Sequence, residues 1–137
     1  MTGILIVTHQ NLGEALIEAA EFILGVRPEA VSAVSIDLNE NAEKLRQKIA
    51  DGIKSVKGNN GVLILTDMFG GSPSNLSYSF LEEGKVEVLS GVNLPILIKA
   101  IRIRQDKALP DIIKEVEDYG KKSISIASSI LKGNKRG

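Results

Sequence analysis

The segment ILIVTHQNLGEALIEAAEFILG, residues 4–25, begins with a continuous apolar run and then changes to a helical repeat of apolar residues. An unbroken apolar run is typical of a strand that is covered on both faces, as in a parallel sheet. From Leu12 onward the apolar residues recur with the spacing of one helix face, and Gly25 fits the residue that ends a helix. The segment therefore predicts a strand over 4–7 and a helix up to Leu24, the repeating unit of a parallel α/β fold.

The rest of the chain repeats this alternation. Apolar runs predict three further strands, over residues 30–36, 61–66 and 86–90. Helical spacing predicts helices after each strand, and their candidate N-terminal caps are Asn39, Ser72 and Asn93. A fifth helix is predicted from about Pro110 to Tyr119, with Gly120 as its end. Right-handed crossovers then predict a three-layer α/β/α fold with a mainly parallel sheet in the order 2-1-3-4.

The end of the chain has a different pattern. SISIAS, residues 123–128, alternates polar and apolar residues, which favours a half-exposed strand, although Ile124, Ala127 and Ile130 also share a helix face. The strand over 86–90 would otherwise be an exposed edge, so we expect SISIAS to form an antiparallel edge strand exchanged between the subunits of a dimer. Residues 1–131 are thus predicted to form a single domain, followed by a polar tail over 132–137.

Composition excludes several classes of function. The chain has 137 residues with 17 Lys and Arg against 17 Asp and Glu, so it lacks the net charge that attracts nucleic acid. It contains no cysteine, which excludes thiol chemistry and thiolate metal sites. No metal ligand set and no cofactor motif is apparent. MTGILIV lacks the basic start of a secretion signal, so a cytoplasmic location is expected.

The residues that carry chemistry follow two strands. His9, the only histidine, comes directly after the first strand, and Asp67 comes directly after the strand over 61–66. Neighbouring strands at the switch point of such a sheet would bring the two side chains together. A carboxylate that accepts one ring N–H leaves the other ring nitrogen as a nucleophile. Gly70, Gly71 and Ser72 then open a helix whose amides suit a phosphoryl group, so the pattern predicts a transient phosphohistidine.

Five blocks of sequence carry a resemblance to a known family. They are ILIVTH (4–9), AEFILG (20–25), NENAEKL (39–45), GVLILTDMFGGSPSN (61–75) and SGVNLPIL (90–97). The chain resembles, over nearly its whole length, the IIA domains of the mannose (mannose–fructose–sorbose) family of the phosphoenolpyruvate-dependent sugar phosphotransferase system. The resemblance implies a phosphohistidine at His9 with Asp67 as its hydrogen-bonding partner. It also implies that Thr8, Gly70, Gly71 and Ser72 shape the phosphoryl pocket.

The resemblance also implies partners. These are phospho-HPr as the donor, a separate IIB protein as the acceptor, a second copy of the chain in a homodimer, and a membrane only through a transporter complex. One departure is that Gln10 and Asn11 follow the histidine where many members have glycine next. Two alternatives stay open: the phosphoryl-donor subunit of dihydroxyacetone kinase, and a receiver-like domain that accepts phosphate on Asp67. Treating the phosphorylated protein with alkali would distinguish the receiver-like domain from a histidine phosphocarrier, because phosphohistidine survives alkali and an acyl phosphate does not.

Overall fold

The structure is a computed structural model that describes residues 1–132. It contains the strands β1 (Gly3–His9), β2 (Val31–Ile36), β3 (Val62–Thr66) and β4 (Val86–Ser90). Its helices are α1 (Leu12–Leu24), α2 (Ala42–Val56), α3 (Ser72–Tyr78), α4 (Leu94–Ile103), α5 (Leu109–Lys122) and α6 (Ala127–Leu131). The strands pair in parallel in the order β2-β1-β3-β4, which confirms the predicted order of the sheet.

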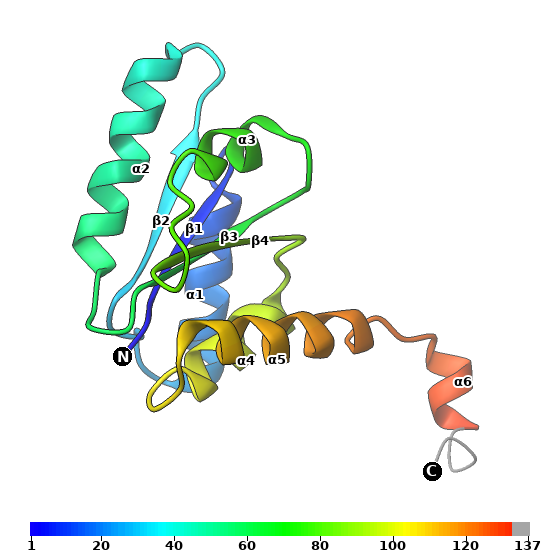
Figure 1. Cartoon of the computed structure of the whole chain (residues 1–137). Helices are drawn as coiled ribbons and strands as arrows, with labels where there is room; N and C mark the ends of the chain where they lie inside the picture. Colours follow the sequence, from blue (N-terminus) through cyan, green and yellow to red (C-terminus); the bar gives the residue numbers. More distant parts are fainter. Residues whose placement is uncertain (133–137) are drawn as a thin grey trace.

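The sheet is the middle of three layers (Figure 1). Because successive side chains of a strand point to opposite faces, β1 contributes to two cores. Ile4 and Ile6 pack with α1, α4 and α5, whereas Leu5 and Val7 pack with α2 and α3. Both faces are therefore covered, and this explains why β1 and β3 are continuous apolar runs rather than alternating ones.

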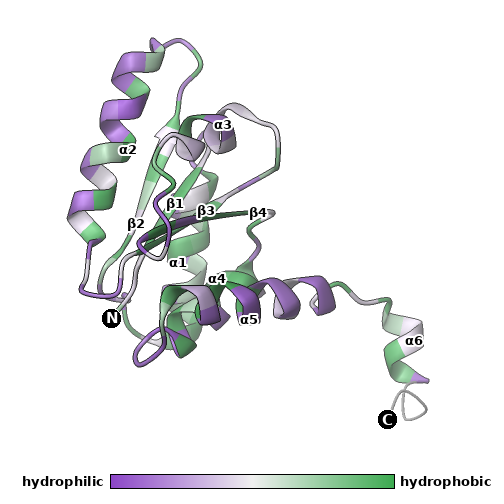
Figure 2. Ribbon diagram, viewed as in Figure 1, coloured by the Kyte–Doolittle hydropathy of each residue, from purple (hydrophilic) through white to green (hydrophobic). Residues whose placement is uncertain are grey.

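The helices α2 and α5 are amphipathic, with many hydrophilic residues along them (Figure 2). Gly25 adopts the left-handed conformation at the end of α1 and donates its N–H to the Glu21 carbonyl, as predicted. Asn93 also caps α4 as predicted, since its side chain accepts the Ile96 N–H. Within residues 1–132, the structure contains no helix with the length and apolar character needed to cross a bilayer.

Two predicted helix starts are wrong by one or two residues. Asn41, rather than Asn39, caps α2, because its side chain accepts the N–H of Lys44 at 2.8 Å. Asn39 instead belongs to a turn in which its N–H binds the Asp37 side chain. Gly71 occupies the cap position of α3, so Ser72 is the first residue of this helix and its hydroxyl is not used as the cap.

The predicted end of the fifth helix is also wrong, because Gly120 lies inside α5. A Cβ at residue 120 would lie 2.7 Å from Cδ1 of Ile96 in α4. Glycine therefore suits the close approach of α4 and α5 here, since a side chain would have to displace that of Ile96, and it does not mark a change of backbone direction. Sequence alone cannot separate these two uses of glycine.

The predicted strand over 123–128 is not present in the described chain. Residues 123–126 form no ladder with the sheet, and Ala127–Leu131 is the short helix α6. Figure 1 shows this segment leading away from the body of the molecule. A strand needs a neighbour for its backbone groups, and a helix satisfies its own, as in the bond from Ile130 N–H to the Ile126 carbonyl. Apart from Lys132, the predicted polar tail lies outside the described residues.

Candidate functional site

The candidate site lies at the switch point of the sheet, where β2 is added on one side of β1 and β3 on the other. β1 and β3 are neighbours, with Val7 paired to Thr66, and their carboxyl ends lie at the same edge. The helices that follow them, α1 and α3, pack on opposite faces of the sheet. Such a switch point leaves a crevice in which parallel α/β proteins bind ligands. His9 ends β1 and Asp67 follows β3, so both residues are held at this crevice by buried strands.

His9 and Asp67 are joined by two hydrogen bonds. Oδ2 of Asp67 accepts the backbone N–H of His9 at 2.8 Å and lies 2.7 Å from Nδ1 of the ring. Because an ionised carboxylate can only accept, the ring proton lies on Nδ1 and Nε2 carries the lone pair. The His9 side chain is 35% exposed, and that of Asp67 is 11% exposed. The predicted pair is therefore formed, with Nε2 as its unprotonated nitrogen.

Asp67 stays ionised in this setting. Burial raises the pKa of its carboxyl group, but the N–H groups of the His9 backbone, the His9 ring and the Met68 backbone outweigh burial, so the pKa falls below its ordinary value. The Met68 N–H binds Oδ1 at 3.0 Å. Asp67 therefore presents a negative charge to the imidazole, which stabilises positive charge that develops on the ring.

Gly71 forms the wall beside the imidazole. A Cβ at this position would lie 3.0 Å from Cε1 and 3.7 Å from Nε2 of His9, and 3.2 Å from Cγ of Met68. Ser72 begins α3 next to this wall, and within residues 1–132 its hydroxyl makes no hydrogen bond. Of the predicted phosphoryl-binding residues, Gly71 thus lies beside the imidazole, and Ser72 follows it at the start of α3.

Substitution of Gly71 by alanine is expected to slow phosphotransfer at His9 by about tenfold, since small misplacements of reacting atoms are costly. The added methyl group has to displace either the ring or the Met68 side chain. The measurement is the rate of phosphoryl uptake, with the melting temperature as the control for folding. An unchanged rate would show that the Met68 side chain moves to accommodate the methyl group and that the imidazole keeps its position.

Thr8 and Gly70, the other two predicted phosphoryl-binding residues, organise the backbone next to His9 and Gly71. Thr8 is fully buried and its hydroxyl oxygen accepts the N–H of Gly13 at 2.9 Å, so the side chain fixes the start of α1. Gly70 has a φ of 84° and turns the loop between Asp67 and α3. Nothing lies within 4 Å of a Cβ built on Gly70, so its contribution to the site is the loop's shape.

A cluster of hydroxyl groups that was not predicted from the sequence lies beneath this loop. Ser74 is fully buried, and its Oγ lies 2.7 Å from Oγ1 of Thr66 and 3.1 Å from Oγ of Ser90. Ser74 also donates to the Met68 carbonyl. The cluster therefore ties α3 and the ends of β3 and β4 to the residue whose N–H holds Asp67. Its only signal in the sequence is a hydroxyl residue at the end of each of two strands.

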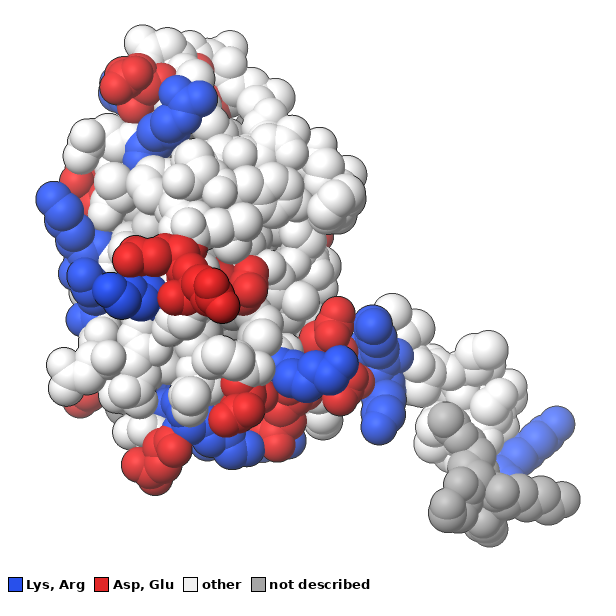
Figure 3. Space-filling view, viewed as in Figure 1, with Lys and Arg blue, Asp and Glu red and all other residues white. Residues whose placement is uncertain are grey.

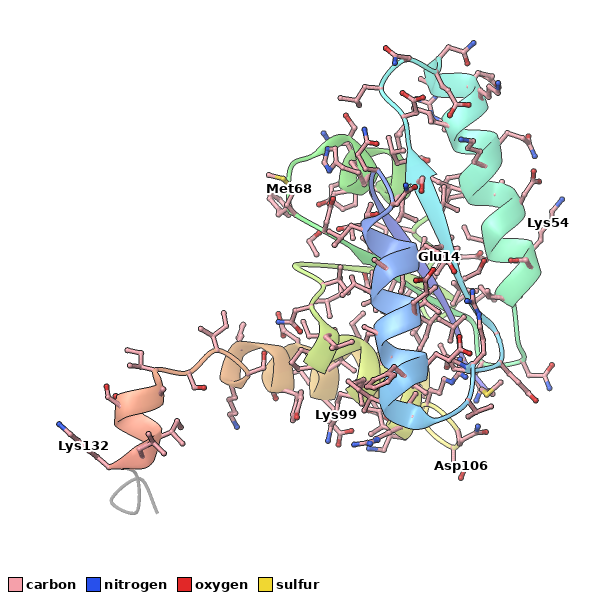
Figure 4. All side chains as sticks on the ribbon, turned by 180° about the vertical axis from the view of Figure 1, so that it is seen from behind. Glu14, Lys54, Met68, Lys99, Asp106 and Lys132 are labelled. Atoms are coloured by element: carbon pink, nitrogen blue, oxygen red, sulfur yellow. The ribbon has the colours of Figure 1, made fainter. Side chains whose placement is uncertain are left out.

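The surface around the site is uncharged and partly apolar. From residue 68 to residue 81, and from residue 10 to residue 13, the sequence contains no ionisable side chain except Tyr78. Leu12, Met68 and Phe69 are exposed here. Figure 3 shows uncharged side chains over α3 and its loop, and Figure 4 labels Met68 as it projects from that loop. We call Leu12, Met68 and Phe69 the apolar rim of the site.

Gln10, the residue after His9, has an unusual backbone conformation. Its φ is 51°, which places a non-glycine residue in the left-handed region. The turn demands this conformation, because only Gln10 and Asn11 connect β1 to α1. For a residue with a side chain the left-handed conformation costs about 1 kcal/mol. Ala30, before β2, is the other residue besides glycine within 1–132 with a positive φ, of 52°.

The parallel sheet and the paired histidine and aspartate at its switch point define an α/β protein with a candidate nucleophile at the crevice where such folds bind ligands. The chain matches the family described as "PTS system fructose IIA component" over residues 3–117. It belongs to this family, which confirms the resemblance drawn from the sequence, and it is a IIA component of a sugar phosphotransferase system.

Individual relatives agree with this assignment. The chain is 30% identical over 132 residues to the fructose-specific EIIA component of Bacillus subtilis, covering 96% of this chain and 90% of that one. It is 36% identical over 105 residues to the mannose-specific EIIAB component of Escherichia coli K12, covering 76% of this chain but only 32% of that protein. The crystal structure of phosphotransferase system component EIIA from Streptococcus agalactiae superposes with a TM-score of 0.83 at 26% identity, covering 94% and 99% of the two chains.

Proposed function

We propose that the chain accepts a phosphoryl group from phospho-HPr on Nε2 of His9 and passes it to a IIB acceptor. The observation that carries this proposal is the hydrogen bond between Nδ1 of His9 and Asp67, which leaves Nε2 as the ring nitrogen with a free lone pair. The exposed fraction of His9, 35%, gives a partner access to this nitrogen.

The transfer is a displacement at phosphorus. The Nε2 lone pair of His9 forms the new P–N bond as the P–N bond to the donor's histidine breaks, and the electron pair of that bond returns to the donor. The proton on Nδ1 stays in place, so His9 gains positive charge that the Asp67 carboxylate stabilises. Transfer to the acceptor repeats the step in the opposite sense: phospho-His9 is the phosphoryl donor, the P–Nε2 bond breaks, and the imidazole of His9 is the leaving group.

A phosphoacceptor role for Asp67 itself fits the geometry less well. Its Oδ2 accepts two hydrogen bonds from His9 and its Oδ1 accepts one from Met68. A carboxylate held in this way is a weaker nucleophile, because the hydrogen bonds stabilise the negative charge on its oxygens. The imidazole has no such restraint on Nε2.

The test is incubation with phosphoenolpyruvate, enzyme I and HPr, followed by mass spectrometry of the intact chain. We expect one phosphoryl group per chain, without added nucleotide, and a label that survives alkali and is lost in acid. Addition of a IIB protein should then remove it. A label that alkali removes would instead indicate an acyl phosphate and would contradict the proposal.

We also propose that two copies associate through the C-terminal segment. β4 pairs with β3 and, apart from a bridge between Glu82 and Val86, its outer edge has no partner in the described chain. Beside it lies a groove lined by Leu89, Asn93 and Ile96, among others. The segment after α5 is apolar and exposed, with Ile124 at 83% and Leu131 at 82%. Covering β4 with this segment from a second copy would remove both an open edge and an exposed apolar surface.

Ending the chain at Ser123, which keeps α5 whole, is therefore expected to abolish the dimer. Light scattering coupled to gel filtration gives the mass directly. Ile124→Asp should have the same effect, whereas Phe22→Asp is the matched control, since Phe22 is an equally exposed apolar residue on α1. If the shortened chain remains a dimer, the subunits meet on another surface.

A further inference from the structure

We propose that Gln10 is a specificity-determining residue that contacts the protein docked over His9. The inference rests on the phosphocarrier function proposed above and names one side chain of this chain that recognises its partner. Gln10 has a backbone conformation in which glycine would be less strained than glutamine.

The turn between β1 and α1 favours glycine at residue 10. β1 ends at His9 and α1 begins at Leu12, so the chain reverses within Gln10 and Asn11. This requires a φ of 51° at Gln10, where a Cβ is strained and glycine is not. Strained residues of this kind concentrate at functional sites, where another role outweighs the strain. A glutamine here therefore indicates a role for its side chain.

The Gln10 side chain has no role within the chain itself. It is exposed, and among residues 1–132 its carboxamide makes no hydrogen bond. Its backbone is only weakly held, with the N–H at 3.4 Å from the Ile36 carbonyl. Because the carboxamide is exposed and makes no hydrogen bond among residues 1–132, it is available to a partner outside the chain.

The surroundings of Gln10 point to a protein surface as that partner. The residue adjoins His9 in sequence and precedes Leu12 of the apolar rim by two residues, and the three rim residues carry no charge. Interfaces commonly combine an apolar centre with a few polar groups that fix orientation. The Gln10 carboxamide supplies one donor and one acceptor in a rim that otherwise offers few, so we assign it to hydrogen bonds with the partner's backbone.

Three variants distinguish the role of the Gln10 side chain from the effect of the strained backbone. Gln10→Ala removes the carboxamide and retains the strained turn. Gln10→Gly removes both. Ala30→Gly is the matched control, because Ala30 has the same backbone conformation at the opposite end of the sheet, before β2. Each variant is compared with the wild-type chain for the KM and kcat of phosphoryl uptake from phospho-HPr, for the spontaneous hydrolysis of phospho-His9, and for melting temperature.

We expect Gln10→Ala and Gln10→Gly to raise the KM for the donor alike, by about tenfold, the scale of one lost interfacial contact. The kcat and the hydrolysis rate should stay within about twofold of wild type. Gln10→Gly, unlike Gln10→Ala, should also raise the melting temperature by about 2–4 °C, because only glycine relieves the backbone strain. Ala30→Gly should leave KM unchanged.

Two results would overturn the inference. Wild-type KM in both Gln10 variants would show that the residue is a turn residue only. Faster hydrolysis of phospho-His9 in both would show that the carboxamide contacts the phosphoryl group and not the partner. Failure of the proposed function is distinguishable from either result, because the wild-type chain itself would then take up no phosphoryl group.

Discussion

Replacing His9 by alanine is expected to reduce phosphoryl uptake from phospho-HPr to an undetectable level. The imidazole is the only one in the chain, and the geometry leaves its Nε2 as the nucleophile. The fold should survive, because the His9 side chain is at the surface and β1 is held by apolar residues on both faces. Intact mass after incubation with the donor measures the effect.

His9→Gln is the companion variant for this test. It keeps a polar side chain of moderate size beside Asp67 but has no nitrogen that attacks phosphorus. Both variants should have melting temperatures close to that of the wild-type chain and no alkali-stable label. An alkali-stable label on His9→Ala would place the phosphoryl group on another residue and would exclude the proposed mechanism.

Replacing Asp67 by asparagine is expected to slow phosphotransfer by ~10²-fold or more, the scale of a lost proton-handling partner. The asparagine keeps the shape of the side chain but has no charge to stabilise the imidazolium. Its amide group can also donate to Nδ1, which would move the ring proton to Nε2 and remove the lone pair that reacts. Single-turnover rates from phospho-HPr measure the loss.

Asp37→Asn is the matched control, since Asp37 is an exposed aspartate whose side chain accepts the Asn39 N–H in a turn. It should transfer at the wild-type rate. A wild-type rate in Asp67→Asn would mean that Asp67, too, only organises its loop through the Met68 N–H.

The lowered pKa of Asp67 also predicts that the stability of the folded chain depends on pH. The pKa of Asp67 is lowered in the folded chain, because the hydrogen bonds from His9 and Met68 outweigh the opposing effect of burial. The folded state therefore binds fewer protons there than the unfolded state, whose carboxyl group titrates near about 4. The stabilisation is complete above that pH and is lost as the pH falls through the lower folded-state value. Urea unfolding should show the difference between wild type and Asp67→Asn shrinking below about pH 4.

The sequence predicted the sheet order and the His9–Asp67 pair because both depend on features that a sequence displays. Buried strands appear as apolar runs, and residues directly after them must lie at the carboxyl edge of a parallel sheet. The hydroxyl cluster of Thr66, Ser74 and Ser90 could not be predicted, since it joins residues from three elements by distances that only packing determines.

Residues 123–131 show a second reason why a structure cannot be predicted fully from sequence patterns. Their alternating pattern indicates a strand, yet the described chain forms the short helix α6 after an extended stretch. A strand at an edge depends on a neighbour, and the alternation in the sequence says nothing about whether that neighbour is in the same molecule. Gly120 shows the same limit within one chain: its role depends on Ile96 of another helix.

The occupation of Nδ1 by Asp67 has a kinetic consequence. With one ring nitrogen bound, the incoming and outgoing phosphoryl groups both use Nε2, so the donor and the acceptor have to occupy the same surface in turn. A ternary complex of carrier, donor and acceptor is then sterically forbidden. Steady-state kinetics should follow a ping-pong pattern in which unphosphorylated HPr and an excess of acceptor compete for the carrier. The flux would pass through a maximum as either partner becomes too abundant.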